Sequence, residues 1–163
     1  MQKDRLVIKN RRGELIFSYE GDPGISCFDD VNLQDADMRG LDLAGTWLEG
    51  NNMAGADLRG TILYWGVLLH VNLEGANLEG ANLQGSSLNF VNFRNANLRK
   101  ANIGPSNLGE PSMLQAVDFT GADLTGAILT DAAYDLETKF PAGFRPEEHG
   151  MALTKRRKSP KDS

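Results

Sequence analysis

Apolar residues recur at every fifth position over most of this chain. From Leu33 to Met113 the interval holds without a gap; it then slips by one residue and resumes at Phe119. A period of five fits neither an α-helix, which repeats every 3.6 residues, nor a flat strand, which repeats every two. We therefore expect the chain to turn a corner in every repeat. The apolar positions, which we call centres, are Leu33, Met38, Leu43, Leu48, Met53, Leu58, Leu63, Leu68, Leu73, Leu78, Leu83, Leu88, Phe93, Leu98, Ile103, Leu108, Met113, Phe119, Leu124 and Leu129.

The residues around each centre also follow a rule. The residue before the centre is usually Asn or Asp, the residue two before is usually small, and the residue two after is often Gly, as in Ala56-Asp57-Leu58-Arg59-Gly60. Because side chains alternate along an extended segment, the centre and the small residue face inward together and their neighbours face outward. Gly, Asn and Asp tolerate the backbone angles of a corner.

A second period, of 20 residues, sets the size of one coil. The small inward residues repeat in the order valine, alanine, alanine, serine, so four pentads make one four-sided coil. Stacked coils pair through their backbones at about 4.8 Å per layer. Two successive rows are Val71, Ala76, Ala81, Ser86 and then Val91, Ala96, Ala101, Ser106.

Over residues 26–131 these pentads resemble those of pentapeptide repeat proteins. The resemblance implies an all-β fold, a right-handed quadrilateral β-helix (solenoid) of about five coils. The pentads at Thr61–Gly66 and Pro111–Ala116 depart from the consensus.

The ends of such a stack need caps, because an open coil exposes unpaired backbone and an apolar interior. Arg5–Lys9 and Glu14–Ser18 are strand-like and suit an N-terminal hairpin cap, and the aromatic residues after position 133 resemble the C-terminal lid of many family members. The expected units are 1–25, N-terminal capping strands; 26–131, the β-helix; 132–151, the C-terminal cap; and 152–163, a disordered basic tail.

Charge and composition indicate where in the cell the protein is expected. The net charge is −5, with the excess of acid before residue 151 and a surplus of Lys and Arg after it. A single cysteine rules out an internal disulfide, the N-terminus lacks the apolar region of a signal peptide, and no apolar run approaches the length of a membrane span. We expect a cytoplasmic protein with no membrane association.

Catalytic chemistry has little support. The chain has two histidines and one cysteine, with no zinc-ligand spacing and no phosphate-binding glycine motif. A nucleophile needs a base and an orienting group within reach, and nothing in the sequence supplies all three. We predict that the protein is not an enzyme and binds no cofactor or metal.

One group of outward positions is apolar instead of polar, and we call it the apolar cluster. Residues 20 apart should stack, which places Trp47 over Val67 and His70 beside Phe90. Contiguous exposed apolar patches usually mark contact surfaces, so we predict binding of a protein partner or self-association. The alternative is that the chain's own cap or tail covers the cluster. Its members are Trp47, Ile62, Tyr64, Trp65, Val67, Leu69, His70 and Phe90.

The acidic exterior suggests a second function. Some members of the family protect or inhibit DNA gyrase, and an acidic rod that resembles duplex DNA could bind gyrase or another topoisomerase by charge. We expect Asp37 and Asp57 to stack in one column, and Asp42 and Asp123 in another. The competing interpretation is a solvated surface that keeps the rod soluble. Arginines such as Arg39 interrupt the negative charge.

The end of the chain is basic. Lys155–Lys158 form an unbroken run of positive charge, followed by Lys161. Such a run can touch nucleic acid or an anionic surface, and otherwise it is a solvated terminus. Elsewhere in the chain we expect no direct nucleic-acid binding.

Overall fold

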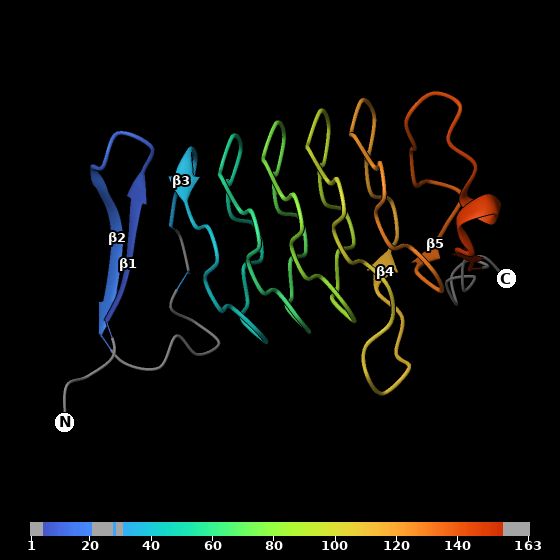
Figure 1. The fold of residues 1–163 in the computed structure, drawn as a ribbon, viewed down its shortest axis with the longest axis horizontal. Coiled ribbons are helices and arrows are strands. Elements are labelled where there is room, and N and C mark those ends of the chain that lie inside the picture. Colours follow the sequence, from blue (N-terminus) through green and yellow to red (C-terminus); the bar gives the residue numbers. More distant parts are fainter. Residues whose placement is uncertain (1–4, 21–27, 29–30, 155–163) are drawn as a thin grey trace, which may run out of the picture.

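The computed structural model describes residues 5–20, 28 and 31–154. Its coils stand in a row, with a hairpin at one end and the C-terminal segment at the other (Figure 1). Successive coils pair mostly through single parallel bridges, one in each pentad, because a corner follows every few residues. The regular elements of the described residues are β1 (Arg5–Asn10), β2 (Leu15–Glu20), β3 (Ala36–Asp37), β4 (Met113–Leu114), β5 (Ala133–Tyr134), the 3₁₀ turn η1 (Pro146–His149) and β6 (Ala152–Leu153).

From Asn32 to Asn102 the bridges join residues 20 apart, and together with the later bridges they define four faces, which confirms the predicted right-handed quadrilateral β-helix. We name each face after its stacked outward residues. The asparagine face carries Asn32, Asn52, Asn72, Asn92, Asp118 and Lys139; the aspartate–arginine face carries Asp37, Asp57, Asn77, Asn97 and Asp123; the isoleucine face carries Asp42, Ile62, Asn82, Asn102 and Ile128; and the tryptophan face carries Trp47, Val67, Ser87, Met113, Ala133 and Ala152.

The leucine-rich interior runs the length of the stack, and aromatic rings close its C-terminal end. Phe93 stacks on Phe119 with ring centroids 5.2 Å apart, and Phe119 stacks in turn on Phe140 at 5.8 Å. Phe140 then stacks on Phe144 at 5.2 Å. Because Phe93 and Phe119 are fully buried centres, this column ties the C-terminal segment to the core.

The N-terminal hairpin lies against the first coil. β1 pairs antiparallel with β2 and, along its other edge, antiparallel with β3, where Lys9 lies opposite Asp37. The Phe17 ring of β2 is 5.3 Å from the ring of the buried Phe28. The hairpin thus gives the first coil a strand partner and an apolar contact.

Two of the predicted centres are wrong, because the chain has a six-residue insertion after Ile103. The bridge interval lengthens from 20 to 26 residues at Ser87–Met113, and the extra chain forms a loop between Gly104 and Glu110 that projects beside β4 (Figure 1). Leu108, predicted inside, lies in this loop and is 67% exposed. Met113 is an outward residue, and the buried centre of that pentad is Leu114.

The insertion also moves the columns that follow it. Asp123 stacks on Asn97 and so shares a face with Asp37 and Asp57, not with Asp42 as expected. The small inward position predicted for Ser106 is taken by Ser112, which is fully buried and donates to the Leu83 carbonyl at 3.0 Å. Ser106 instead organises the loop.

Strand pairing extends past residue 151, where the sequence places the end of the lid. β6 pairs in parallel with β5, and the Thr154 amide donates to the Tyr134 carbonyl at 2.7 Å. Residues 155–163, which hold the basic run, lie outside the described residues. The predicted unit boundaries stay predictions.

Candidate protein-binding surface

The apolar cluster spreads over the tryptophan face, its two corners and the edge of the isoleucine face. Trp47 and Val67 stack on the tryptophan face through a parallel bridge, which confirms their predicted neighbourhood. Ile62 lies on the isoleucine face between Asp42 and Asn82. The members with large exposed side chains are Trp47 at 48%, Ile62 at 38%, Trp65 at 42% and Phe90 at 49%. Tyr64, Val67 and Leu69 are partly buried, and His70 is exposed.

Three aromatic members occupy corners whose backbone is left-handed. Trp65, His70 and Phe90 have φ of 57°, 58° and 63°. Most corners of this kind are Gly here, as at Gly45 and Gly85. The left-handed region costs an L-residue about 1–2 kcal/mol, and strained positions of this sort cluster at functional sites. Backbone stability alone does not account for aromatic residues at these corners.

The His70 corner is built from stacked rings. The ring centroids of His70 and Phe90 are 4.7 Å apart and their planes differ by 7°, as the 20-residue period predicts. Phe90 is half exposed, so the outer side of this stack faces solvent. The corner therefore presents a flat aromatic plate at one edge of the tryptophan face.

The inserted loop supports the opposite corner. Tyr64 stacks on Trp65 with centroids 5.4 Å apart. The Asn107 amide donates to the Tyr64 hydroxyl at 3.2 Å, and that hydroxyl donates back to the Asn107 side-chain carbonyl. A side chain at Gly85 would collide with Trp65, because the indole Cδ1 lies 2.5 Å from where its Cβ would be. The chain's own loop thus covers part of this corner and leaves Trp65 substantially exposed.

Two apolar residues beside the cluster were wrongly predicted to be buried centres. Leu108 is exposed on the inserted loop, whose Asn107 hydrogen-bonds Tyr64. Met113 continues the tryptophan face next to Ser87. Both fell on the five-residue interval and were assigned to the core. Pro105 was the available sign of the loop: it stands where a corner needs positive φ, which proline cannot adopt.

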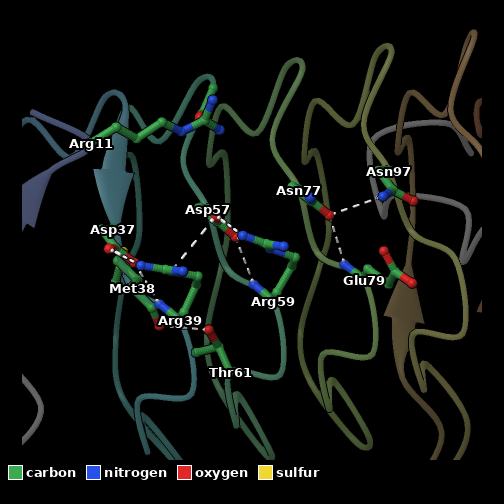
Figure 2. A network of polar contacts seen from close by, with 11 residues as sticks. Arg11, Asp37, Met38, Arg39, Asp57, Arg59, Thr61, Asn77, Glu79 and Asn97 are labelled. Atoms are coloured by element: carbon green, nitrogen blue, oxygen red, sulfur yellow. Dashed lines mark hydrogen bonds and ion pairs between the residues drawn. The ribbon is translucent and has the colours of Figure 1, made fainter.

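The aspartate–arginine face is a lattice of paired charges. Arg39 Nη2 donates to Asp37 at 2.6 Å, and Arg59 Nη2 donates to Asp57 at 2.7 Å (Figure 2). Arg39 also lies 3.8 Å from Asp57. Hydrogen bonds from the guanidinium groups lower the pKa of Asp37 and of Asp57, so both stay ionised. The carboxylates of these coils are neutralised by neighbouring arginines.

The same pairing continues near the C-terminal end. Asp118 lies 3.3 Å from Arg94 and 3.4 Å from Lys139. Burial raises the pKa of Asp118, but hydrogen bonds from Thr120 and Arg94 outweigh it and lower the pKa to about 2. Asp123 pairs with Arg99 at 3.3 Å. Asp37, Asp57, Asp118 and Asp123 are therefore locally neutralised, whereas acidic residues such as Glu74 and Glu79 form no salt bridge within the described residues.

The described residues offer neither a metal-binding group nor a membrane-spanning helix. Within them, no group of three His, Cys, Asp or Glu side chains could hold a metal ion. In the same part of the chain, no helix is long and apolar enough to cross a bilayer. Among the described residues, the exposed aromatic side chains are the feature that departs most clearly from the repeat.

Comparison with known proteins agrees with the geometry. The pentapeptide repeat family matches residues 26–63, 68–104 and 112–132, more than half of the chain, as eight copies of the repeat. No curated protein sequence matches the chain significantly.

The chain is also similar to solved structures, one of them with a TM-score above 0.5. A pentapeptide repeat protein from the Arabidopsis thaliana thylakoid lumen is 25% identical, with a TM-score of 0.51 over 68% of this chain and 73% of that one. One from Nostoc PCC 7120 is 29% identical over 69% of this chain and 84% of that one, with a TM-score of 0.41. QnrB1, a plasmid-mediated fluoroquinolone resistance protein, is 14% identical over 72% of this chain and 89% of that one, with a TM-score of 0.30. The chain belongs to the pentapeptide repeat family.

Proposed function

We propose that this protein is a non-catalytic, rigid scaffold that binds another protein through the apolar cluster. The observation that carries the proposal is the placement of Trp65, His70 and Phe90 in left-handed corners on both edges of the tryptophan face. Glycine would be the less strained residue at each corner, so the aromatic side chains must serve something other than the backbone.

The rigidity of the surface supports binding. The rings are held by stacking on Tyr64 and on one another, and the corners are fixed by hydrogen bonds between coils, such as the Trp65 amide to the Gln84 carbonyl at 3.1 Å. A surface that is already ordered loses little conformational freedom on association. Exposed Trp and Tyr are also the side chains that most often dominate the energy of protein interfaces.

Two glutamate substitutions at corners test the proposal. Trp65→Glu places a charge in the apolar cluster, whereas Lys100→Glu places one at another left-handed corner, outside the cluster. Affinity capture with each immobilised full-length variant, read by mass spectrometry beside the oligomeric state in solution, should show losses for Trp65→Glu only. An unchanged partner set and oligomeric state for Trp65→Glu would count against the proposal.

Gyrase binding by DNA mimicry is the alternative, and the charge lattice gives it less support. A mimic needs outward negative charge at a regular rise, and here arginines neutralise Asp37, Asp57 and Asp123. A supercoiling assay with purified gyrase tests it. Protection or inhibition that survives Trp65→Glu would favour the alternative, and no effect at high protein excess would remove it.

A further inference from the structure

The tryptophan face and its corners differ from the rest of the coils in charge. They hold carboxylates and no Lys or Arg, whereas the basic side chains of the coils lie on other faces, as Arg39, Arg59 and Arg94 do. The segments that form this region are 44–50, 64–70, 84–90, 104–116, 130–136 and 150–154. Their acidic residues are Glu49, Glu110, Asp131 and Asp135.

Two of these acidic residues lie on segments that carry or adjoin the exposed aromatics. Glu49 follows Trp47 by two residues, and it is exposed at the edge of the tryptophan face. Glu110 closes the inserted loop, where its amide donates to the Ser106 hydroxyl at 3.2 Å. The Ser106 Cβ and the Trp65 indole converge on Gly85. Within the described residues, neither glutamate forms a salt bridge, unlike the aspartates of the aspartate–arginine face.

This combination favours one chemistry of partner. Aromatic ring faces attract guanidinium and ammonium groups, and unpaired carboxylates beside them complete an ion pair. The same carboxylates repel phosphate, which disfavours nucleic acid and anionic membranes as occupants. A purely apolar partner would leave the carboxylates without a role.

We propose that the apolar cluster binds a Lys- and Arg-rich segment of a partner protein, a refinement that rests on the proposed function. Basic side chains of the segment lie over the faces of Trp47, Trp65 and Phe90. Glu49 and Glu110 pair with them at the two sides of the cluster. Extended chain fits the site, because the exposed rings are spread along and across a face whose coils repeat every 4.8 Å or so.

The protein itself carries a competing segment. Thr154 ends the described chain on the tryptophan face, bonded to Tyr134, and Lys155–Lys158 follow it directly in the sequence. Nine residues can span about 30 Å, more than the roughly 24 Å from the β6 layer down to the Trp47 layer. The tail could therefore reach the same rings, and the experiment must separate the two occupants.

The test is a peptide titration followed by fluorescence anisotropy at about 0.15 M salt, where weak long-range attraction is screened. The probe is a dye-labelled 12-residue peptide of alternating Arg and Ser, and the control peptide has citrulline in place of Arg. The full-length protein should bind the Arg peptide, and the citrulline peptide should bind at least tenfold more weakly. Trp65→Ala should weaken binding of the Arg peptide about threefold.

Charge variants give the decisive comparison. Glu49→Gln with Glu110→Gln should weaken binding of the Arg peptide about tenfold, whereas Glu74→Gln with Glu79→Gln, the same change of net charge on other faces, should change it less than twofold. Equal losses in the two double variants would mean attraction by net charge alone and would overturn the inference.

A variant with Lys155, Arg156, Arg157 and Lys158 replaced by serine separates the occupants. Binding of the peptide to both this variant and the wild type supports the partner. Binding to the variant alone would assign the site to the chain's own tail and overturn the partner. Binding to neither would overturn the inference, while a loss of captured proteins with Trp65→Glu would still uphold the proposed function.

Discussion

Replacing Asn51 by valine should stabilise the protein, although asparagine is common in its repeats. Asn51 points inward, at a position where the coils below and above hold Val31 and Val71. It is 5% exposed, its Oδ1 has no hydrogen-bond partner, and its Nδ2 donates only a long bond of 3.4 Å to the Glu49 carbonyl. The substitution removes a buried, unsatisfied polar atom and restores the valine column.

The expected gain follows from the cost of an unsatisfied group. Leaving a buried acceptor unpaired costs about 1–3 kcal/mol, and the lost 3.4 Å bond offsets little of it. We expect the free energy of unfolding to rise by about 1–2 kcal/mol. For a chain of this size that corresponds to about 2–8 °C in Tm.

The neighbouring asparagine provides the control for Asn51→Val. Asn52 faces outward and its Oδ1 accepts from Asn72 Nδ2 at 3.1 Å, so Asn52→Val should lower the free energy of unfolding by about 1 kcal/mol. Thermal and urea unfolding followed by far-ultraviolet circular dichroism measures both. If Asn51→Val destabilises the protein, or if both variants shift Tm in the same direction, the assignment of Asn51 to the interior is refuted.

Three further predictions concern acid stability, a corner and the inserted loop. Because the pKa of Asp118 is lowered to about 2, its charged form stabilises the fold above the unfolded pKa near 3.8. That contribution, about 2 kcal/mol, is lost as the pH falls toward 2. The free energy of unfolding of Asp118→Asn should therefore decrease less between pH 4 and pH 2 than that of the wild type. Gly85→Ala should displace the Trp65 indole and shift tryptophan fluorescence, whereas Gly80→Ala, at a left-handed corner with open space around it, should strain the backbone without that shift. Ser112→Ala should cost about 1–2 kcal/mol in urea unfolding, because the buried Ser112 hydroxyl bonds the Leu83 and Gly104 carbonyls, and Ser87→Ala on the outside should cost less.

Most of the architecture could be predicted from two periods in the sequence. Five residues set the corner and 20 set the coil, so the stacking of Trp47 on Val67 and of His70 on Phe90 followed from numbering alone. The physical reason is that parallel coils pair residues by position, and each inward position must fill the same cross-section.

The insertion could not be predicted from the five-residue period, because an insertion of about one pentad leaves the spacing of apolar residues nearly unchanged. Six extra residues equal one pentad plus one, so Leu108 and Met113 kept the interval although neither is a buried centre. Spacing tests only the interval between apolar residues, and it does not test whether the chain folds outward. The hydrogen bonds between the loop and Tyr64 depend on that outward fold, so the spacing alone does not predict which part of the apolar cluster the chain covers.

Photocrosslinking from single positions tests the central claim most directly. A p-benzoylphenylalanine in place of Leu69 lies within the apolar cluster, and one in place of Gln34 lies on the opposite edge of the asparagine face, outside it. Our account predicts that irradiated cells give a discrete crosslinked product from position 69, abolished by Trp65→Glu, and none of that mass from position 34. A product of equal yield from both positions, or none from position 69, would contradict the claim that the apolar cluster is the protein-binding surface.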